Sequence, residues 1–142
     1  MSKDTTQITE PIAQLFQGKN FAFVSILMKD GSPQISPTWV DIEKNHEYSI
    51  LVNTAVGRIK HKNVSRDPRL AIPIINSSNP YEMVTIRGKV TEQLTQDAAE
   101  EHIDKLAKKY LGVDTYPGRS PGEKRVILKI RPEKIFYQQP LR

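Results

Sequence analysis

Residues 20–41, NFAFVSILMKDGSPQISPTWVD, contain two strand-like runs on either side of an Asp-Gly turn. The first run is rich in Phe, Val and Ile, which favour β-structure, and Asp30-Gly31 is a strong hairpin signal. The second run, residues 34–41, alternates polar and apolar side chains and contains Pro37, which cannot donate a ladder hydrogen bond. We therefore expect an antiparallel hairpin whose second strand lies at a sheet edge or carries a bulge.

The rest of the chain continues this pattern of short strands, with helices in the longer gaps. Further strands are predicted at residues 47–53, 70–75, 82–93, 124–131 and 134–138, and helices at 8–17, 58–65 and 96–111. We also expect a polar turn at 43–46, a loop at 76–80, a bulge at Gly88, a helix cap at Thr95 and a strand break at Pro132. The pattern predicts a mainly β (α+β) fold, a six- to seven-stranded antiparallel barrel with short flanking helices.

Length and composition favour a single domain over residues 1–142, in which residues 1–18 form an N-terminal arm and helix. The chain has no cysteine, which excludes disulfides, zinc–thiolate sites and thiol nucleophiles. Its apolar runs are too short to cross a bilayer, and its first residues contain no apolar signal segment. We therefore expect a cytoplasmic protein with no membrane partner.

Positive charge is concentrated in one place. The chain has 21 Lys and Arg against 16 Asp and Glu, and residues 58–69 hold five of these basic side chains against the single acid Asp67. Nucleic-acid binders usually spread their charge along a face and place aromatic side chains beside it, and this segment has no aromatic residue. The cluster therefore favours a small anion such as a phosphate over nucleic acid, and the alternative is a solvated helix face.

The junction that begins Asn53-Thr54-Ala55-Val56-Gly57 predicts an anion site, because it joins a strand to the start of a helix. Free N–H groups and the helix dipole favour an anion there. Thr54 supplies a hydroxyl, Arg58 can fork two phosphate oxygens, and Lys60 adds a point charge. Asn63, in the same helix, either belongs to this site or caps the following turn.

A row of polar side chains on the strand predicted at residues 34–41 is the other candidate binding feature. Alternation places Gln34, Ser36 and Thr38 on one face, where they either meet solvent or hydrogen-bond a flat heteroaromatic ring. Tyr81, at the end of a predicted loop, either covers a ring or packs at a subunit contact. Trp39 is interpreted as a core residue.

Other chemistry finds little support in the sequence. His46, His61 and His102 lack metal-ligand spacing, and His46 and His102 are interpreted as surface residues. No nucleophile motif is present. We therefore expect neither a catalytic side chain nor a metal site, and any catalysis would depend on a bound cofactor.

Residues 30–40, 50–60 and 63–69 (DGSPQISPTWV, ILVNTAVGRIK and NVSRDPR) resemble the pyridoxamine-phosphate-oxidase-like flavin and deazaflavin oxidoreductases, which have a split β-barrel fold. The resemblance implies a homodimer whose cofactor lies in a groove between the subunits. It places Arg58 and Lys60 at the cofactor phosphate and the polar row beside the ring. The full set of expected cofactor-binding residues is Gln34, Ser36, Thr38, Asn53, Thr54, Arg58, Lys60, Asn63 and Tyr81.

The resemblance also implies a cofactor and an activity. The compact chain, which ends at Arg142 without the longer C-terminal segment of pyridoxamine phosphate oxidase itself, is more similar to the branch that uses the deazaflavin F-420. FMN is the alternative cofactor. The expected function is an oxidoreductase that uses bound F-420 or FMN for hydride transfer to a small organic substrate. The alternative is a non-catalytic protein that binds or stores the same cofactor.

Overall fold

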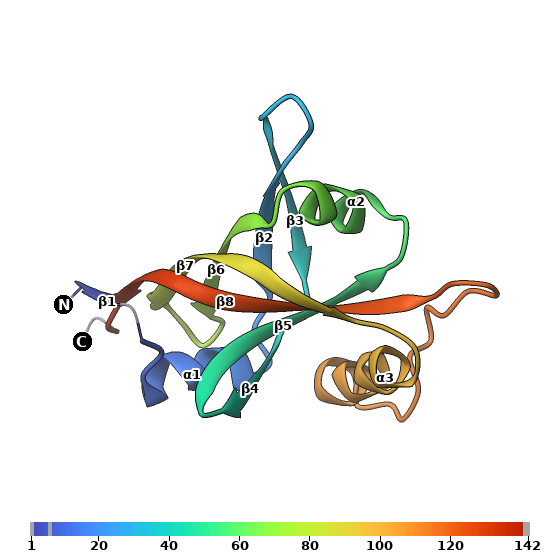
Figure 1. Cartoon of the computed structure of the whole chain (residues 1–142). Coiled ribbons are helices and arrows are strands. Elements are labelled where there is room, and N and C mark those ends of the chain that lie inside the picture. Colours follow the sequence, from blue (N-terminus) through green and yellow to red (C-terminus); the bar gives the residue numbers. More distant parts are fainter. Residues whose placement is uncertain (1, 6, 141–142) are drawn as a thin grey trace.

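The computed structural model describes residues 2–5 and 7–140, in which three helices flank one antiparallel sheet (Figure 1). The helices are α1 (Glu10–Gln17), α2 (Ile59–Arg66) and α3 (Asp97–Leu111). The strands are β1 (Ser2–Thr5), β2 (Ala22–Leu27), β3 (Pro33–Thr38), β4 (Asp41–Asn45), β5 (Glu47–Ala55), β6 (Arg69–Asn76), β7 (Asn79–Leu94) and β8 (Arg125–Gln138).

The sheet runs in the order β3-β2-β6-β7-β8-β5-β4, with β1 added beside the end of β8. Long, bent strands β7 and β8 let the sheet coil around its own core (Figure 1). The two end strands, β3 and β4, are not paired with each other in the described residues. This arrangement is an antiparallel split barrel and confirms the predicted fold class.

The hairpin predicted from residues 20–41 is present, with β3 at the sheet edge where Pro37 loses no ladder bond. Directly opposite residues share a face, so the register divides this hairpin into two sides. The inner side carries Val24 and Ile26 with the polar row of β3, and the outer side carries Phe23 and Ile35.

Four local predictions are wrong. Residues 43–46 are not a turn: all but His46 belong to β4, a polar strand at the sheet end, and His46 alone turns the chain with φ 68°. Pro132 does not divide the last strand, because it lies opposite Gly88 at a bulge and needs no donor there. The α3 N-cap is Gln96 rather than Thr95. The predicted loop at 76–80 is a tight turn at Ser77-Ser78.

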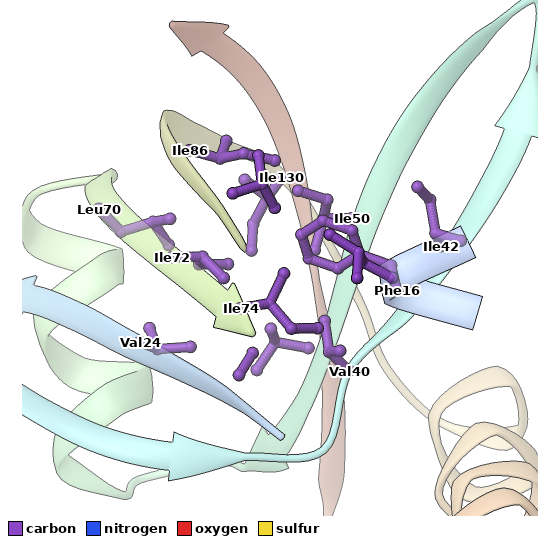
Figure 2. Packing of buried hydrophobic residues seen from close by; sticks show 14 of the residues in the cluster. Phe16, Val24, Val40, Ile42, Ile50, Leu70, Ile72, Ile74, Ile86 and Ile130 are labelled. Atoms are coloured by element: carbon purple, nitrogen blue, oxygen red, sulfur yellow. The ribbon is translucent and has the colours of Figure 1, made fainter. Parts of the chain in front are cut away.

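The core fills the inner side of the sheet and is closed by α1 (Figure 2). Ile50, Ile72 and Ile130 come from three different strands and are completely buried. Phe16, also completely buried, extends from α1 into the same cluster. Helices α2 and α3 pack elsewhere, α2 against β2 and β5 and α3 against β8 and β5. None of the described helices is long and apolar enough to cross a membrane.

Candidate functional site

A cavity of about 280 Å³ lies where the ends of β3 and β5 meet the start of α2. Helix α3, the segment after it and the first residue of β8 complete its wall. The lining residues are Phe21, Pro37, Thr38, Trp39, Asn53, Thr54, Arg58, Lys60, Ile103, Leu106, Tyr116 and Arg125. Of the nine expected cofactor-binding residues, the structure brings five together here: Thr38, Asn53, Thr54, Arg58 and Lys60.

The turn from β5 into α2 positions the two basic residues. Gly57 has a φ of 90°, which a residue without a side chain adopts at no steric cost. Its N–H donates to Nδ1 of His61 at 3.0 Å, and the Val56 N–H donates to the Lys124 carbonyl at 2.8 Å. These bonds hold the turn against the first turn of the helix and the start of β8. Arg58 is therefore the N-cap of α2, and Lys60 follows in its first turn.

Positive charge exceeds negative charge at the cavity. Arg58 and Arg125 both donate to Glu123, at 2.9 and 2.7 Å, so one carboxylate is shared by two guanidinium groups. Lys60 has no ion pair within the described residues. Its burial, together with the charges of Arg58 and Arg125, lowers the pKa of its ammonium group. Three cations facing one carboxylate leave a site that favours an additional anion.

Behind the cavity wall, a buried chain of hydrogen bonds fixes Asn53. Its Oδ1 accepts from Nε of Arg125 at 2.8 Å, and its Nδ2 donates to the Ala99 carbonyl at 3.0 Å. Since Arg125 can only donate, the amide orientation is set, and Nδ2 also donates to Nδ1 of His102 at 3.1 Å. The imidazole therefore carries its proton on Nε2, which donates to Asp41 at 3.1 Å.

His102 is consequently not the surface residue that the sequence suggested, because it is 7% exposed and joined to this network. Burial raises the pKa of the Asp41 carboxyl, but the hydrogen bonds from His102 and from the Ile42 N–H, with the charge of Lys105, outweigh it and lower the pKa to about 2. Among the described residues, no group of three or more His, Asp or Glu side chains is arranged to hold a metal ion.

The other side of the cavity is aromatic. Trp39 stacks on Tyr110 with ring centroids 5.3 Å apart, and the edge of Tyr116 meets Trp39 at 5.8 Å. The guanidinium of Arg125 lies 5.4 Å from the centre of the Tyr116 ring. A flat ring could pack against this wall while its charged end reached the cations.

Gln34 and Ser36 continue the face of Thr38 along β3, as the alternation predicted. This face points inward rather than to solvent, because the exposed side of β3 is the side of Ile35. Gln34 Oε1 and Ser36 Oγ are buried and have no hydrogen-bond partner within residues 2–5 and 7–140. Two unsatisfied polar atoms on one strand face fit a hydrogen-bonding heteroaromatic ring. They are covered in this structure, so contact with a ring requires these side chains to rotate.

Asn63 and Tyr81 do not line the cavity. The amide of Asn63 is buried between Met28 and Arg66, donating to the sulfur at 3.2 Å and accepting from the guanidinium at 2.7 Å. The side chain therefore has structural contacts, but it does not cap the following turn as the sequence alternative suggested. Tyr81 lies at the start of β7 and is 60% exposed, so its expected role in the site of a second subunit stays a prediction.

Sequence reasoning missed Arg125 and Tyr116. Trp39, interpreted as a core residue, does pack against a buried cluster on α3, and it also lines the cavity. Arg125 begins a strand whose next residues, Val126 to Leu128, are buried and apolar. A cation at the start of such a run was the only local signal. The sequence around Tyr116 contains no such signal, because this residue lies in a Gly- and Pro-rich segment that reaches the cavity only through the packing of α3.

The comparisons agree with this geometry. The family model described as pyridoxamine 5'-phosphate oxidase matches residues 8–139. The chain belongs to the pyridoxamine 5'-phosphate oxidase family. No curated protein matches it.

Solved structures share the fold of this family member at low sequence identity. An F420 reductase has a TM-score of 0.75 at 23% identity, covering 90% of this chain and 98% of its own. HupZ from Group A Streptococcus has a TM-score of 0.65 at 19% identity, with coverages of 94% and 97%. The protein Rv2991 from Mycobacterium tuberculosis has a TM-score of 0.68 at 16% identity, with coverages of 94% and 90%.

Proposed function

We propose that this chain is a flavin- or deazaflavin-dependent oxidoreductase that binds F-420 or FMN in the cavity at the start of α2. The observation that carries the proposal is the convergence of Arg58, Lys60 and Arg125 on a cavity where, among the described residues, Glu123 alone forms ion pairs with these three side chains. A phosphate ester accepts charge-assisted hydrogen bonds from such groups, each contributing about 1.5–3 kcal/mol. The similarity to a solved F420 reductase favours the deazaflavin.

The protein contributes binding and alignment. Arg58 and Lys60 hold the phosphate, with the Thr54 hydroxyl beside it, and Thr38 begins the polar face that meets the ring. Arg125, held by Asn53 and Glu123, supplies a third cation at a fixed place. When bound, the tricyclic ring supplies the hydride carrier that no amino-acid side chain provides.

The lining residues include no Asp, Glu or His side chain. General acid–base catalysis by a carboxylate or imidazole is therefore not built into this wall, and the role of the chain is to hold cofactor and substrate in contact and to exclude water. The stacked Trp39 and the Tyr116 ring serve this role, because they give the cavity an apolar side.

The outer face of the sheet supports a homodimer. Phe23, Ile35 and Ile75 are 42%, 62% and 41% exposed, and register places them on the same side of β2, β3 and β6. Exposed apolar patches of this kind mark protein–protein contacts. A second copy of the chain is the occupant that we propose, with the cofactor groove at the edge of the contact.

Titration of the apoprotein with FMN and, separately, with F-420 tests the proposal. We expect saturable binding of at least one of them. Calorimetry and the change in cofactor fluorescence measure this binding. Failure of both to bind would overturn it. Tight binding without turnover on any of a panel of small unsaturated substrates would leave the binding site standing and would favour a storage protein over an oxidoreductase.

A further inference from the structure

His102 of α3 is a buried titratable side chain that the proposed function leaves without a role. Its ring lies between β4 and β5, with Nε2 at 3.1 Å from Asp41 Oδ2 and Nδ1 at 3.1 Å from Asn53 Nδ2. Asn53 and Arg125 line the cavity at the start of α2, whereas His102 is not among the lining residues. One amide therefore separates this imidazole from a cation of the proposed phosphate site.

The hydrogen bonds of Asn53 tolerate only one protonation state of this ring. A second proton, on Nδ1 of His102, would point at Asn53 Nδ2, which is itself a donor. Turning the amide over would satisfy that proton, but it would bring Nδ2 against the Nε–H of Arg125 and Oδ1 against the Ala99 carbonyl. A proton on Nδ1 and the bond between Asn53 and Arg125 therefore exclude each other.

Arg125 has few other anchors. Its side chain is 4% exposed, and its Nη1 donates to Glu123 at 2.7 Å while its Nε donates to Asn53 at 2.8 Å. The remaining nitrogen, Nη2, forms no hydrogen bond within the described residues and is the group left to meet an anion. Without the bond to Asn53, the guanidinium can pivot about its contact with Glu123, and Nη2 loses its fixed place.

The charges around His102 keep the effect of a second proton local. The titratable groups linked to the ring are Asp41 of β4, Lys105, Lys109 and Tyr110 of α3, which act on Asp41, and Arg125 of β8, reached through Asn53. Asp41 has a pKa of about 2 and is ionised at neutral pH. An added positive charge on the ring is therefore paired with this carboxylate, and its effect on the cavity comes through Asn53.

We propose that His102 is a positioning residue for the anion site at the start of α2. With Nδ1 unprotonated, His102 holds Asn53 in the orientation that anchors Arg125. With Nδ1 protonated, that anchor is lost and the site binds its anion more weakly. The inference rests on the proposed function, because it concerns the same cavity and the cofactor phosphate that would occupy it.

Two substitutions separate the roles of the two ring nitrogens. His102→Asn keeps an acceptor oxygen near the place of Nδ1 and removes the donor to Asp41, whereas His102→Gln keeps a donor near Asp41 and removes the acceptor. Each variant loses one buried hydrogen bond, so a merely structural role predicts similar effects. We expect His102→Gln to raise the Kd of FMN at least about tenfold at pH 8, and His102→Asn to leave it within about twofold. Calorimetry measures both values.

The pH dependence of binding is the second measurement. Histidines gain their charge between about pH 8 and pH 5, and the phosphate of FMN also titrates in this range. At each pH the original chain is therefore compared with His102→Asn, which retains His46, His61 and every other titratable group. The ratio of the Kd of the original chain to that of His102→Asn should rise at least about fivefold as the pH falls through this range.

The third measurement needs no cofactor. The Nε–H of Arg125 gives a ¹⁵N resonance that is assigned by its absence in Arg125→Lys, and its bond to Asn53 slows exchange of this proton with solvent. At one pH, the exchange should be at least about tenfold faster in His102→Gln than in His102→Asn or in the original chain. The amide spectrum of each variant reports whether it is folded, and if His102→Gln does not fold, the pH series with His102→Asn decides.

Each measurement has a result that would overturn the proposal: equal Kd values in the two variants, a Kd ratio that is constant with pH, or equal exchange of the Arg125 Nε–H in all three chains. Failure of both FMN and F-420 to bind the original chain would instead overturn the proposed function. In that case the exchange of the Arg125 Nε–H still decides whether His102 positions this guanidinium.

Discussion

Nδ1 of His102 accepts a hydrogen bond from the side-chain amide of Asn53 at 3.1 Å, although the two residues lie 49 positions apart in the chain. The contact joins α3 to the end of β5, beside the cavity. Because the same amide also accepts from Arg125, a cavity cation is connected through Asn53 to a histidine that is not itself a lining residue. Asn53 therefore links the packing of α3 to the position of this cavity cation.

Asn53→Leu should lower the free energy of unfolding by about 3 kcal/mol, because the buried Arg125 guanidinium and the His102 imidazole both lose a partner, while the branching and the number of side-chain heavy atoms stay the same. Urea denaturation measures the change. Asn45→Leu, at an exposed position of β4, is the matched control and should change stability by less than about 0.5 kcal/mol. Equal effects of the two substitutions would contradict the coupling described here.

Asp41→Asn should destabilise the protein in a pH-dependent way. The pKa of Asp41 in the folded chain is about 2, below its ordinary value of 3.8, so its charge stabilises the fold above pH 4 by about 2 kcal/mol. This stabilisation is lost as pH falls from about 4 toward 2. Urea denaturation measures the free energy of unfolding of the original chain and of the variant. The difference between the two free energies should therefore have its full value at pH 6 and be smaller at pH 3. A difference that is constant with pH would exclude an ionic role for Asp41.

Arg58→Ala with Lys60→Ala should weaken binding of FMN or F-420 at least about tenfold and leave the fold intact. Arg58 is half exposed, so its bond to Glu123 adds little stability, and Lys60 is a partly buried charge that forms no ion pair in the part of the chain that the structure describes. Calorimetry measures the affinity, and Lys19→Ala with Lys29→Ala removes the same charge at a distance. An unchanged affinity in the first pair would remove these residues from the proposed phosphate site.

The sequence predicted those parts of the structure that depend on neighbouring residues. The Asp-Gly hairpin, the amphipathic α3 and the strand-to-helix turn before Arg58 all follow from local chemistry, and the structure contains each of them. It could not show that residues 41–45 pair with β5, because polar residues at a sheet end resemble a loop. Burial of His102 and Arg125 depends on contacts between distant segments, which a single sequence does not reveal.

Gly88→Ala should destabilise the protein more than Gly31→Ala, and the two substitutions act through different physical causes. A Cβ at Gly88 would lie 2.3 Å from the Arg131 carbonyl oxygen, so the bulge must move, at a cost of about 2–3 kcal/mol. Gly31 has open space and a φ of 87°, so its substitution strains only the turn, by about 1 kcal/mol. Thermal unfolding of both variants measures the two costs, and the opposite ranking would show that β7 and β8 are less closely packed at the bulge.

Ile35→Lys should dissociate the proposed homodimer. Ile35 is 62% exposed on the outer face, so a charge there should disturb folding little but should oppose burial against a second copy. Light scattering during gel filtration measures the molar mass, with Leu111→Lys on α3, where Leu111 is 51% exposed, as control. If the cofactor groove lies at the edge of the contact, Ile35→Lys should also weaken cofactor binding, whereas Leu111→Lys should change neither property. A dimer that survives Ile35→Lys would place the subunit contact on another face.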